Sequence, residues 1–226
     1  MPREDYVSRM NEVVKKRLLR TMVLAALALV IGAGVGWVQI GMKNARTVTK
    51  GSSAEAPIAG LNIGGPFTLT DHEGTEVTEK TYDGQYKLIY FGFTYCPAIC
   101  PTELQKMSRV MNALEDNYPE AAQNIQPLFV TIDPERDTVP VMQEYVNLFH
   151  PRLIGLTGTV PQINIVKKNY RIYASKVETE DQNDYTMDHS SFIYLMGPDN
   201  TLLGMYRTSD TPDGMYQDII KLMKLS

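Results

Sequence analysis

The sequence predicts an α/β domain, a mixed β-sheet flanked by helices, that follows an N-terminal transmembrane helix. Apolar strands alternate with amphipathic helices along most of the chain, and a tight turn near the C-terminus indicates an antiparallel hairpin. A long uncharged segment near the N-terminus predicts the membrane anchor. The 226 residues suffice for one domain of about 150 residues plus these attachments.

The first half of the predicted domain contains a hairpin, two buried strands and a long helix. The strands are rich in aromatic and branched residues, which is typical of buried strands. Proline is favoured at the first helical position, so the helix is predicted to begin at Pro101. The predicted elements are the hairpin strands 65–71 and 76–78, the buried strands 87–93 and 125–132, and the helix 101–117.

The second half continues the alternation and ends in a hairpin and a helix. Gly197-Pro-Asp-Asn200 is a strong turn signal between two apolar runs. The predicted elements are the helix 139–149, the short strand 153–156, a helix marked by Ile163 to Tyr173, the hairpin strands 189–196 and 201–207, and the helix 212–225. This order of elements is that of a thioredoxin-like fold.

The uncharged segment runs for 21 residues from Met22 to Met42. A helix of that length crosses the roughly 30 Å hydrocarbon core of a bilayer. Basic residues directly before it place the N-terminus in the cytoplasm and the domain on the other side. A cleaved signal peptide is the alternative, but its apolar segment usually has about 7–15 residues, and the small-residue motif at Ala54 to Ala56 is followed by Pro57.

We therefore divide the chain into four parts: a cytoplasmic basic segment (1–20), a transmembrane anchor (21–42), a linker (43–60) and the folded domain (61–226). The linker is rich in small and polar residues. A mitochondrial transit peptide fits poorly, because acidic residues occur early. The expected location is a bacterial inner membrane, crossed once, with the domain in the periplasm.

The charge distribution argues against a nucleic-acid partner. The net charge is −4, but residues 1–20 carry +3, which leaves −7 for the remainder. Binding to nucleic acid would require a basic face on the folded part.

Both cysteines, Cys96 and Cys100, lie in one stretch at the end of a predicted strand. Each precedes a proline, which disfavours the helical conformation, so residues 96–100 are predicted to form a loop. Cys100 then lies near the N-terminus of the next helix, where the helix dipole favours a thiolate. At least one sulfur is expected to ionise more easily than a free cysteine.

His189 is the histidine whose position suggests a metal site. In thioredoxin-like folds the loop before the strand that begins at His189 faces the cysteines. Two thiolates and one imidazole suit Cu(I), and also Cu(II) if a further ligand joins, whereas a structural zinc site takes four ligands. The three residues between the cysteines, one more than in thioredoxin-type oxidoreductases, offer a chelate. The residues therefore predict a copper site at Cys96, Cys100 and His189, where metal loading competes with disulfide formation.

Each of these side chains also has a simpler interpretation. A structural disulfide is the default for paired cysteines outside the cytoplasm, although so short a loop removes only about 2 kcal/mol or less of unfolded-chain entropy. His189 alone would be an ordinary half-buried histidine, and His72 and His150 keep that interpretation.

Two further features are weighed in the same way. The Asp133–Thr138 segment offers carboxylates to a partner or to residues behind the metal ligands, but Asp137 or Thr138 is also well placed to cap the next helix. Most methionines lie on apolar helix stripes. Met187, close to His189, is the one methionine considered as a further copper ligand.

Taken together, these motifs resemble the Sco/SenC family of membrane-anchored copper proteins. The resemblance covers roughly residues 60–226. It rests on Phe91-Gly-Phe-Thr-Tyr-Cys96-Pro-x-x-Cys100-Pro101, Asp133-Pro-x-Arg-Asp-Thr138, Asp188-His189-Ser-Ser and Tyr194-Leu-x-Gly-Pro-Asp199. It implies a thioredoxin-like domain that binds one copper at Cys96, Cys100 and His189. It also implies a role in assembling the dinuclear copper centre in subunit II of cytochrome c oxidase.

Three functions remain open at this point. The first is a copper metallochaperone, a carrier without turnover, that receives copper from a periplasmic donor and passes it to the oxidase subunit by ligand exchange. The second is a thiol–disulfide reductase of the subunit II cysteines, or a redox sensor, as some family members are thought to be. The third is a thiol peroxidase that uses the loop from Thr94 to Cys96.

Overall fold

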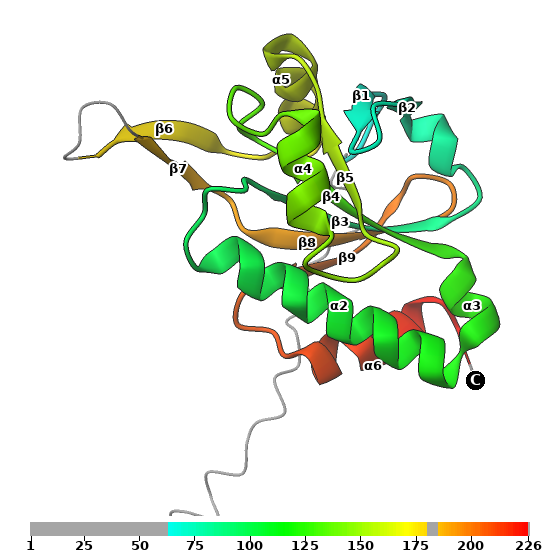
Figure 1. Cartoon of the computed structure of the whole chain (residues 1–226). Coiled ribbons are helices and arrows are strands. Elements are labelled where there is room, and N and C mark those ends of the chain that lie inside the picture. The colour runs from blue at the N-terminus through cyan, green and yellow to red at the C-terminus, as the bar shows by residue number, and fades with distance from the viewer. Residues whose placement is uncertain (1–62, 180–184, 226) are drawn as a thin grey trace, which may run out of the picture. The chain divides into compact units, whose positions relative to one another are not determined.

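The computed structural model describes residues 63–179 and 185–225, which form the predicted α/β domain around a mixed sheet (Figure 1). Neighbours β5, β4 and β3 are parallel, and the other pairs of this sheet are antiparallel. In order across the sheet the strands are β2 (Glu76–Thr78), β1 (Thr68–Asp71), β5 (Ile154–Thr157), β4 (Ile125–Thr131), β3 (Tyr86–Gly92), β8 (Phe192–Met196) and β9 (Leu202–Arg207).

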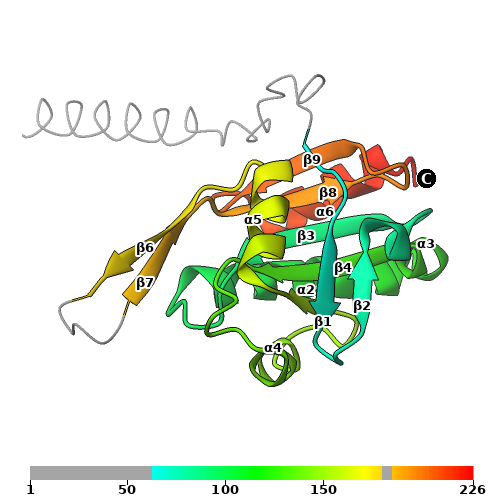
Figure 2. The ribbon, with the colours of Figure 1, turned by 90° about the horizontal axis from the view of Figure 1, so that it is seen from above.

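Helices cover both faces of this sheet. The helical elements are η1 (Glu79–Tyr82), α2 (Ile99–Asn117), α3 (Pro119–Gln123), α4 (Val139–Val146), α5 (Val160–Asn169) and α6 (Pro212–Leu222). Figures 1 and 2 show α2 and α6 side by side on one face and α5 on the other. Contacts of two neighbouring residues of β3 support this arrangement. Gly92 lies against Cys100 of α2, whereas the ring of Phe91 packs against Tyr170 at the end of α5. The mixed sheet flanked by helices is therefore confirmed.

Strand β3 is the centre of the hydrophobic core. It pairs with β4 on one side and β8 on the other, and Lys87 to Phe93 are all buried. The apolar stripe of α2, which includes Leu104 and Met107, packs against this core. The loop after β3 therefore connects a buried strand to a helix that packs against the core, so both of its ends are held in place.

A second sheet consists of the hairpin strands β6 (Ala174–Glu178) and β7 (Tyr185–His189), which project from the domain (Figure 2). The sequence does not predict this hairpin. As a consequence the position expected for His189 is wrong: the residue ends β7, and β8 begins three residues later at Phe192.

Four helix boundaries also differ from the predictions, and α4 and α6 each end three residues early, at Val146 and Leu222. Helix α2 begins at Ile99, so Cys100 lies in its first turn and the predicted loop ends earlier. Proline at the next position is compatible with this, because an amide there has no helical partner. Helix α5 ends at Asn169, since Arg171 adopts a positive φ of 56°, and Tyr173 is 58% exposed.

The basic segment (1–20), the predicted anchor (21–42) and the linker (43–60) all precede the part of the chain that the structure describes. Across residues 63–179 and 185–225, no helix combines the length and apolarity that a membrane crossing needs.

Candidate metal centre

The cysteines lie where β3 gives way to α2. The chain turns after Gly92, and the amide of Cys96 donates to the carbonyl of Phe93 (3.3 Å). Cys100 is completely buried, while Cys96 is half-buried. Glycine at position 92 makes this packing possible, because a Cβ atom there would lie 2.8 Å from the Cys100 Sγ atom.

His189 meets the cysteines from the other side of the site. Its Nε2 atom lies 3.7 Å from Cys100 Sγ, although the two residues are 89 positions apart. Its Nδ1 atom is 2.8 Å from the Ser190 carbonyl oxygen, which only accepts, so Nδ1 carries the proton. In the neutral imidazole the Nε2 lone pair therefore faces the sulfur. The proximity of His189 to the cysteines is confirmed.

The two sulfurs have different environments. The hydrogen bond from the Cys100 thiol, supported by backbone amides at the helix start, lowers the pKa of Cys96 to about 3. That same donated bond, together with burial, raises the pKa of Cys100. The apo site thus holds a half-exposed thiolate at Cys96 and a buried thiol at Cys100. The expectation that one sulfur ionises easily holds for Cys96, whereas the pKa of Cys100, the sulfur at the helix start, is raised. Both cysteines are free.

Tyr90 and Ser191 lie behind the sulfur of Cys100. The Tyr90 hydroxyl is 3.5 Å from Cys100 Sγ and 3.0 Å from Ser191 Oγ. Burial raises the pKa of Tyr90, so the phenol stays protonated. The sequence gives no signal for this contact, because Tyr90 reads as one more apolar residue of a buried strand.

Asp137 supports the cysteine loop and does not cap a helix. Its carboxylate accepts hydrogen bonds from the amide and hydroxyl of Thr94 and from the hydroxyl of Thr131. Thr138 occupies the N-cap position of α4 without a side-chain hydrogen bond. Thr138 therefore occupies the predicted cap position without capping through its side chain, and the capping interpretation is wrong for Asp137. Asp137 is fully buried, so it offers no surface carboxylate to a partner.

The other methionine and histidine candidates lie outside the site. Met187 is buried and lines a cavity of about 130 Å³ with Ile132 and Ile163. His72 accepts from the Gly155 amide, and His150 pairs with Glu115. In the described ranges, 63–179 and 185–225, His, Cys, Asp and Glu side chains form no ready group of three at metal-binding spacing.

The donor atoms nevertheless fit a soft metal ion. Two sulfurs and one imidazole nitrogen are the ligands that Cu(I) prefers. The Ser190 carbonyl fixes the tautomer that such a ligand needs, as residues behind metal-binding histidines commonly do.

Fold and site define a thioredoxin-like protein that has a dithiol beside an imidazole. The SCO1/SenC family matches residues 55–224 of the chain. The chain therefore belongs to the SCO1/SenC family.

Individual relatives agree with this assignment. The Arabidopsis thaliana mitochondrial protein SCO1 homolog 1 is 43% identical over 168 residues, which cover 74% of this chain and 49% of the relative. The matched part thus spans about half of that relative. The mouse mitochondrial protein SCO2 homolog is 38% identical, with 89% of this chain and 78% of the relative covered.

A solved structure gives the same result. The crystal structure of Arabidopsis thaliana ScoI with copper bound is 41% identical and superposes with a TM-score of 0.68. The match covers 73% of this chain and 99% of that chain.

Proposed function

We propose that the domain binds one copper ion through the Cys96 and Cys100 sulfurs and the His189 imidazole, and that it delivers the copper to the dinuclear centre of cytochrome c oxidase subunit II. The observation that carries the proposal is the 3.7 Å approach of His189 Nε2 to Cys100 Sγ. The copper-bound Arabidopsis structure supports the choice of metal. The oxidase partner follows from the family resemblance of the sequence.

The protonation states of the apo site determine how copper is taken up. Cys96 is already a thiolate and needs no deprotonation, whereas Cys100 must release its proton. Because Cys96 is also the more exposed sulfur, it is the first contact for incoming copper, and Cys100 and His189 complete the set. In delivery the exposed sulfur again reacts first, and a thiolate of the acceptor replaces Cys96 before Cys100 and His189 are released.

The ligand set is tested by Cu(I) titration of the reduced full-length protein in detergent, with a competing Cu(I) chelator. The wild-type protein is expected to take up one equivalent. Cys96→Ser, Cys100→Ser and His189→Ala should each weaken binding, and the matched control His72→Ala should not. Stoichiometric binding of unchanged affinity in all three ligand variants would rule out the site.

The difference between the two sulfurs supports a second function, the reduction of a disulfide in the same subunit. Cys96 has the exposed, ionised sulfur of an attacking nucleophile, and Cys100 is the buried partner that resolves the mixed disulfide. The Cys96 thiolate attacks one sulfur of the partner disulfide and releases the other as a thiolate. Cys100 then gives up its proton and attacks the Cys96 sulfur, which breaks the mixed disulfide and releases the second partner sulfur as a thiolate that takes up a proton. The partner gains two electrons, and a Cys96–Cys100 disulfide forms.

His189→Ala separates the two functions. A copper carrier loses one of its ligands, whereas a reductase keeps both reacting sulfurs. Reduction of a subunit II peptide disulfide at the wild-type rate by His189→Ala would favour the reductase.

We also propose that residues 21–42 anchor the protein in a bacterial inner membrane, with the domain and its copper donor in the periplasm. The positive charge before the uncharged segment supports this orientation. In intact spheroplasts, a membrane-impermeant maleimide should label Cys96. Labelling that requires permeabilised membranes would reverse the orientation.

A further inference from the structure

Arg136 lies between the two parts of the chain that carry the candidate ligands. These parts are the cysteine loop, which comprises residues 93–98 and the first turn of α2, and the β6–β7 hairpin, whose last residue is His189. The Arg136 guanidinium carbon is 4.6 Å from the ring centre of Tyr95 in the cysteine loop and 3.7 Å from that of Tyr185 in the hairpin. A single cation thus contacts an aromatic ring from each part.

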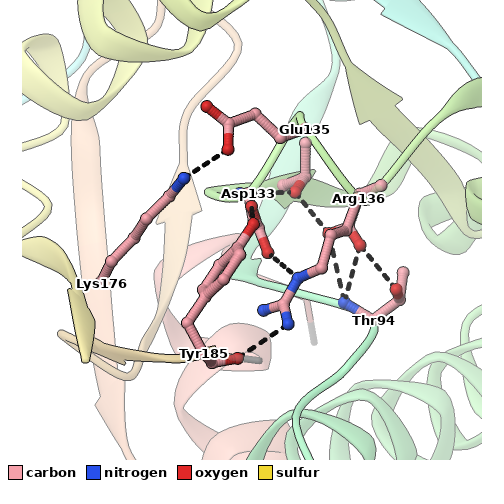
Figure 3. Close-up of polar contacts among 8 residues, drawn as sticks. Thr94, Asp133, Glu135, Arg136, Lys176 and Tyr185 are labelled. Carbon is pink, nitrogen blue, oxygen red and sulfur yellow. Dashed lines mark hydrogen bonds and ion pairs between the residues drawn. The ribbon is translucent and has the colours of Figure 1, made fainter. Parts of the chain in front are cut away.

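Hydrogen bonds fix the guanidinium in this position (Figure 3). Arg136 Nε donates to the buried Asp133 carboxylate at 2.6 Å, and Nη1 donates to the backbone carbonyl of Tyr185 at 2.7 Å. The Tyr185 hydroxyl donates to the other oxygen of Asp133 at 2.8 Å. The side chains of Arg136 and Asp133 are only 16% and 1% exposed, so this is a buried, charge-assisted arrangement.

The residues that Arg136 contacts are themselves close to the candidate ligands, either along the chain or through a ring contact. Tyr95 directly precedes Cys96, and Tyr185 lies four residues before His189 on the same strand. Phe93 lies 5.9 Å from the guanidinium, and its ring packs edge-on against the His189 ring at 5.8 Å. Arg136 therefore contacts the neighbours of both Cys96 and His189 without approaching the sulfurs itself.

The hairpin requires such support. Its two strands pair with each other in a sheet of their own, and a two-stranded sheet alone is marginally stable in water. His189 is joined to the rest of the domain partly through whatever holds this hairpin. Small changes in how residues behind metal ligands orient them commonly change metal affinity by about 10–100-fold.

We propose that Arg136 is a positioning residue of the metal site, which holds the His189 strand and the cysteine loop at the separation that one copper ion requires. The inference rests on the proposed copper function. Arg136 acts through His189, so its removal costs affinity only in a protein that still has the imidazole.

A double-mutant cycle on the full-length protein tests this directly. Cu(I) affinity is measured for wild type, Arg136→Met, His189→Ala and the double variant by chelator competition. Arg136→Met is expected to weaken binding about tenfold in the wild-type background. In the His189→Ala background the same change should cost less than about twofold, because the coupling is already lost.

The exposed ion pair between Lys176 and Glu135 supplies the matched control. It joins the same hairpin to the segment between β4 and α4 that carries Arg136, but both side chains are about half exposed. Glu135→Gln is expected to leave Cu(I) affinity unchanged within about twofold. Arg136→Lys should fall between wild type and Arg136→Met, since it keeps the charge and loses the planar group that contacts the rings.

The outcomes separate the inference from the function on which it rests. An equal loss of affinity in both backgrounds, or no loss in either, would overturn the positioning role. Wild-type protein that binds no stoichiometric copper, or His189→Ala that binds as tightly as wild type, would instead overturn the proposed function. If circular dichroism shows that Arg136→Met is unfolded, Arg136→Lys takes its place in the cycle with the same criteria.

Discussion

The two halves of the candidate site are built into the fold in different ways. Cys100 is completely buried between the central strand β3 and helix α2, in the most strongly supported part of the domain. His189 ends a hairpin that forms a separate sheet, where Val177 is 43% exposed. One half is therefore part of the core, while the other projects as a hairpin and is held against the core by polar and aromatic contacts and by the buried Met187. The position of the Cys100 sulfur therefore depends on the packing of the core, whereas the position of the His189 imidazole depends on how the hairpin is held.

The largest expected effect concerns the two sulfurs. The pKa of Cys96 is lowered to about 3, and that of Cys100 is raised. Alkylation of the reduced apoprotein by iodoacetamide should therefore modify Cys96 at a rate that stays flat between about pH 4 and pH 8. A free cysteine of pKa about 8.5 is ionised to less than about 0.1% at pH 5. Peptide mapping by mass spectrometry should find Cys100 unmodified.

A change at Cys100 sharpens the same comparison. The hydrogen bond from Cys100 is the main cause of the low pKa, so Cys100→Ala should raise the pKa of Cys96 and make its alkylation rate increase with pH. A flat profile in that variant would contradict the account of the two sulfurs.

The next effect is on global stability. Leu104 is fully buried on α2, one turn after Cys100. Leu104→Ala should lower the free energy of unfolding by about 2–5 kcal/mol, because it leaves a cavity in the core. Denaturant unfolding measures this, and a loss below about 1 kcal/mol would mean that the cysteine half is not part of the cooperative core.

A smaller loss is expected at Gly92. An added Cβ would lie 2.8 Å from Cys100 Sγ and 3.1 Å from the Phe129 ring. Gly92→Ala should therefore destabilise the domain by about 1–3 kcal/mol through overpacking. The same variant should bind Cu(I) more weakly, because the displaced atom is a proposed ligand. Unchanged stability and affinity would show that the strand shifts without consequence.

The smallest effect is expected in the hairpin. Val177→Ala, at an exposed position of β6, should change the free energy of unfolding by no more than about 0.5 kcal/mol. Hydrogen exchange should also be faster for the amides of β6 and β7 than for those of β3, because the hairpin opens locally. Equal protection of the hairpin and β3 would remove the contrast between the two halves.

The same contrast explains what the sequence predicts and what it does not. Local patterns suffice for β3 and α2, where a continuous apolar run meets an amphipathic stripe. The hairpin carries no comparable pattern, because strands such as Ala174–Glu178 alternate weakly and face solvent. His189 is consequently expected on the wrong strand, although its proximity to the cysteines follows correctly from the fold.

The supporting residues were harder to predict than the candidate ligands. Asp137 precedes a helix and has the residue type of a cap, but its bonds go to Thr94 and Thr131 on other elements. Arg136 carries no local signal, because Tyr95 and Tyr185 come from distant parts of the chain. Such contacts depend on tertiary structure, and no spacing in the sequence records them.

The central claim is that both sulfurs and the imidazole bind the same copper ion. X-ray absorption of the Cu(I)-loaded full-length protein tests it most directly. We expect two sulfur ligands and one nitrogen ligand at a single copper, with the nitrogen lost and both sulfurs retained in His189→Ala. A nitrogen ligand that persists in His189→Ala, or a wild-type spectrum with sulfur ligands alone, would contradict it.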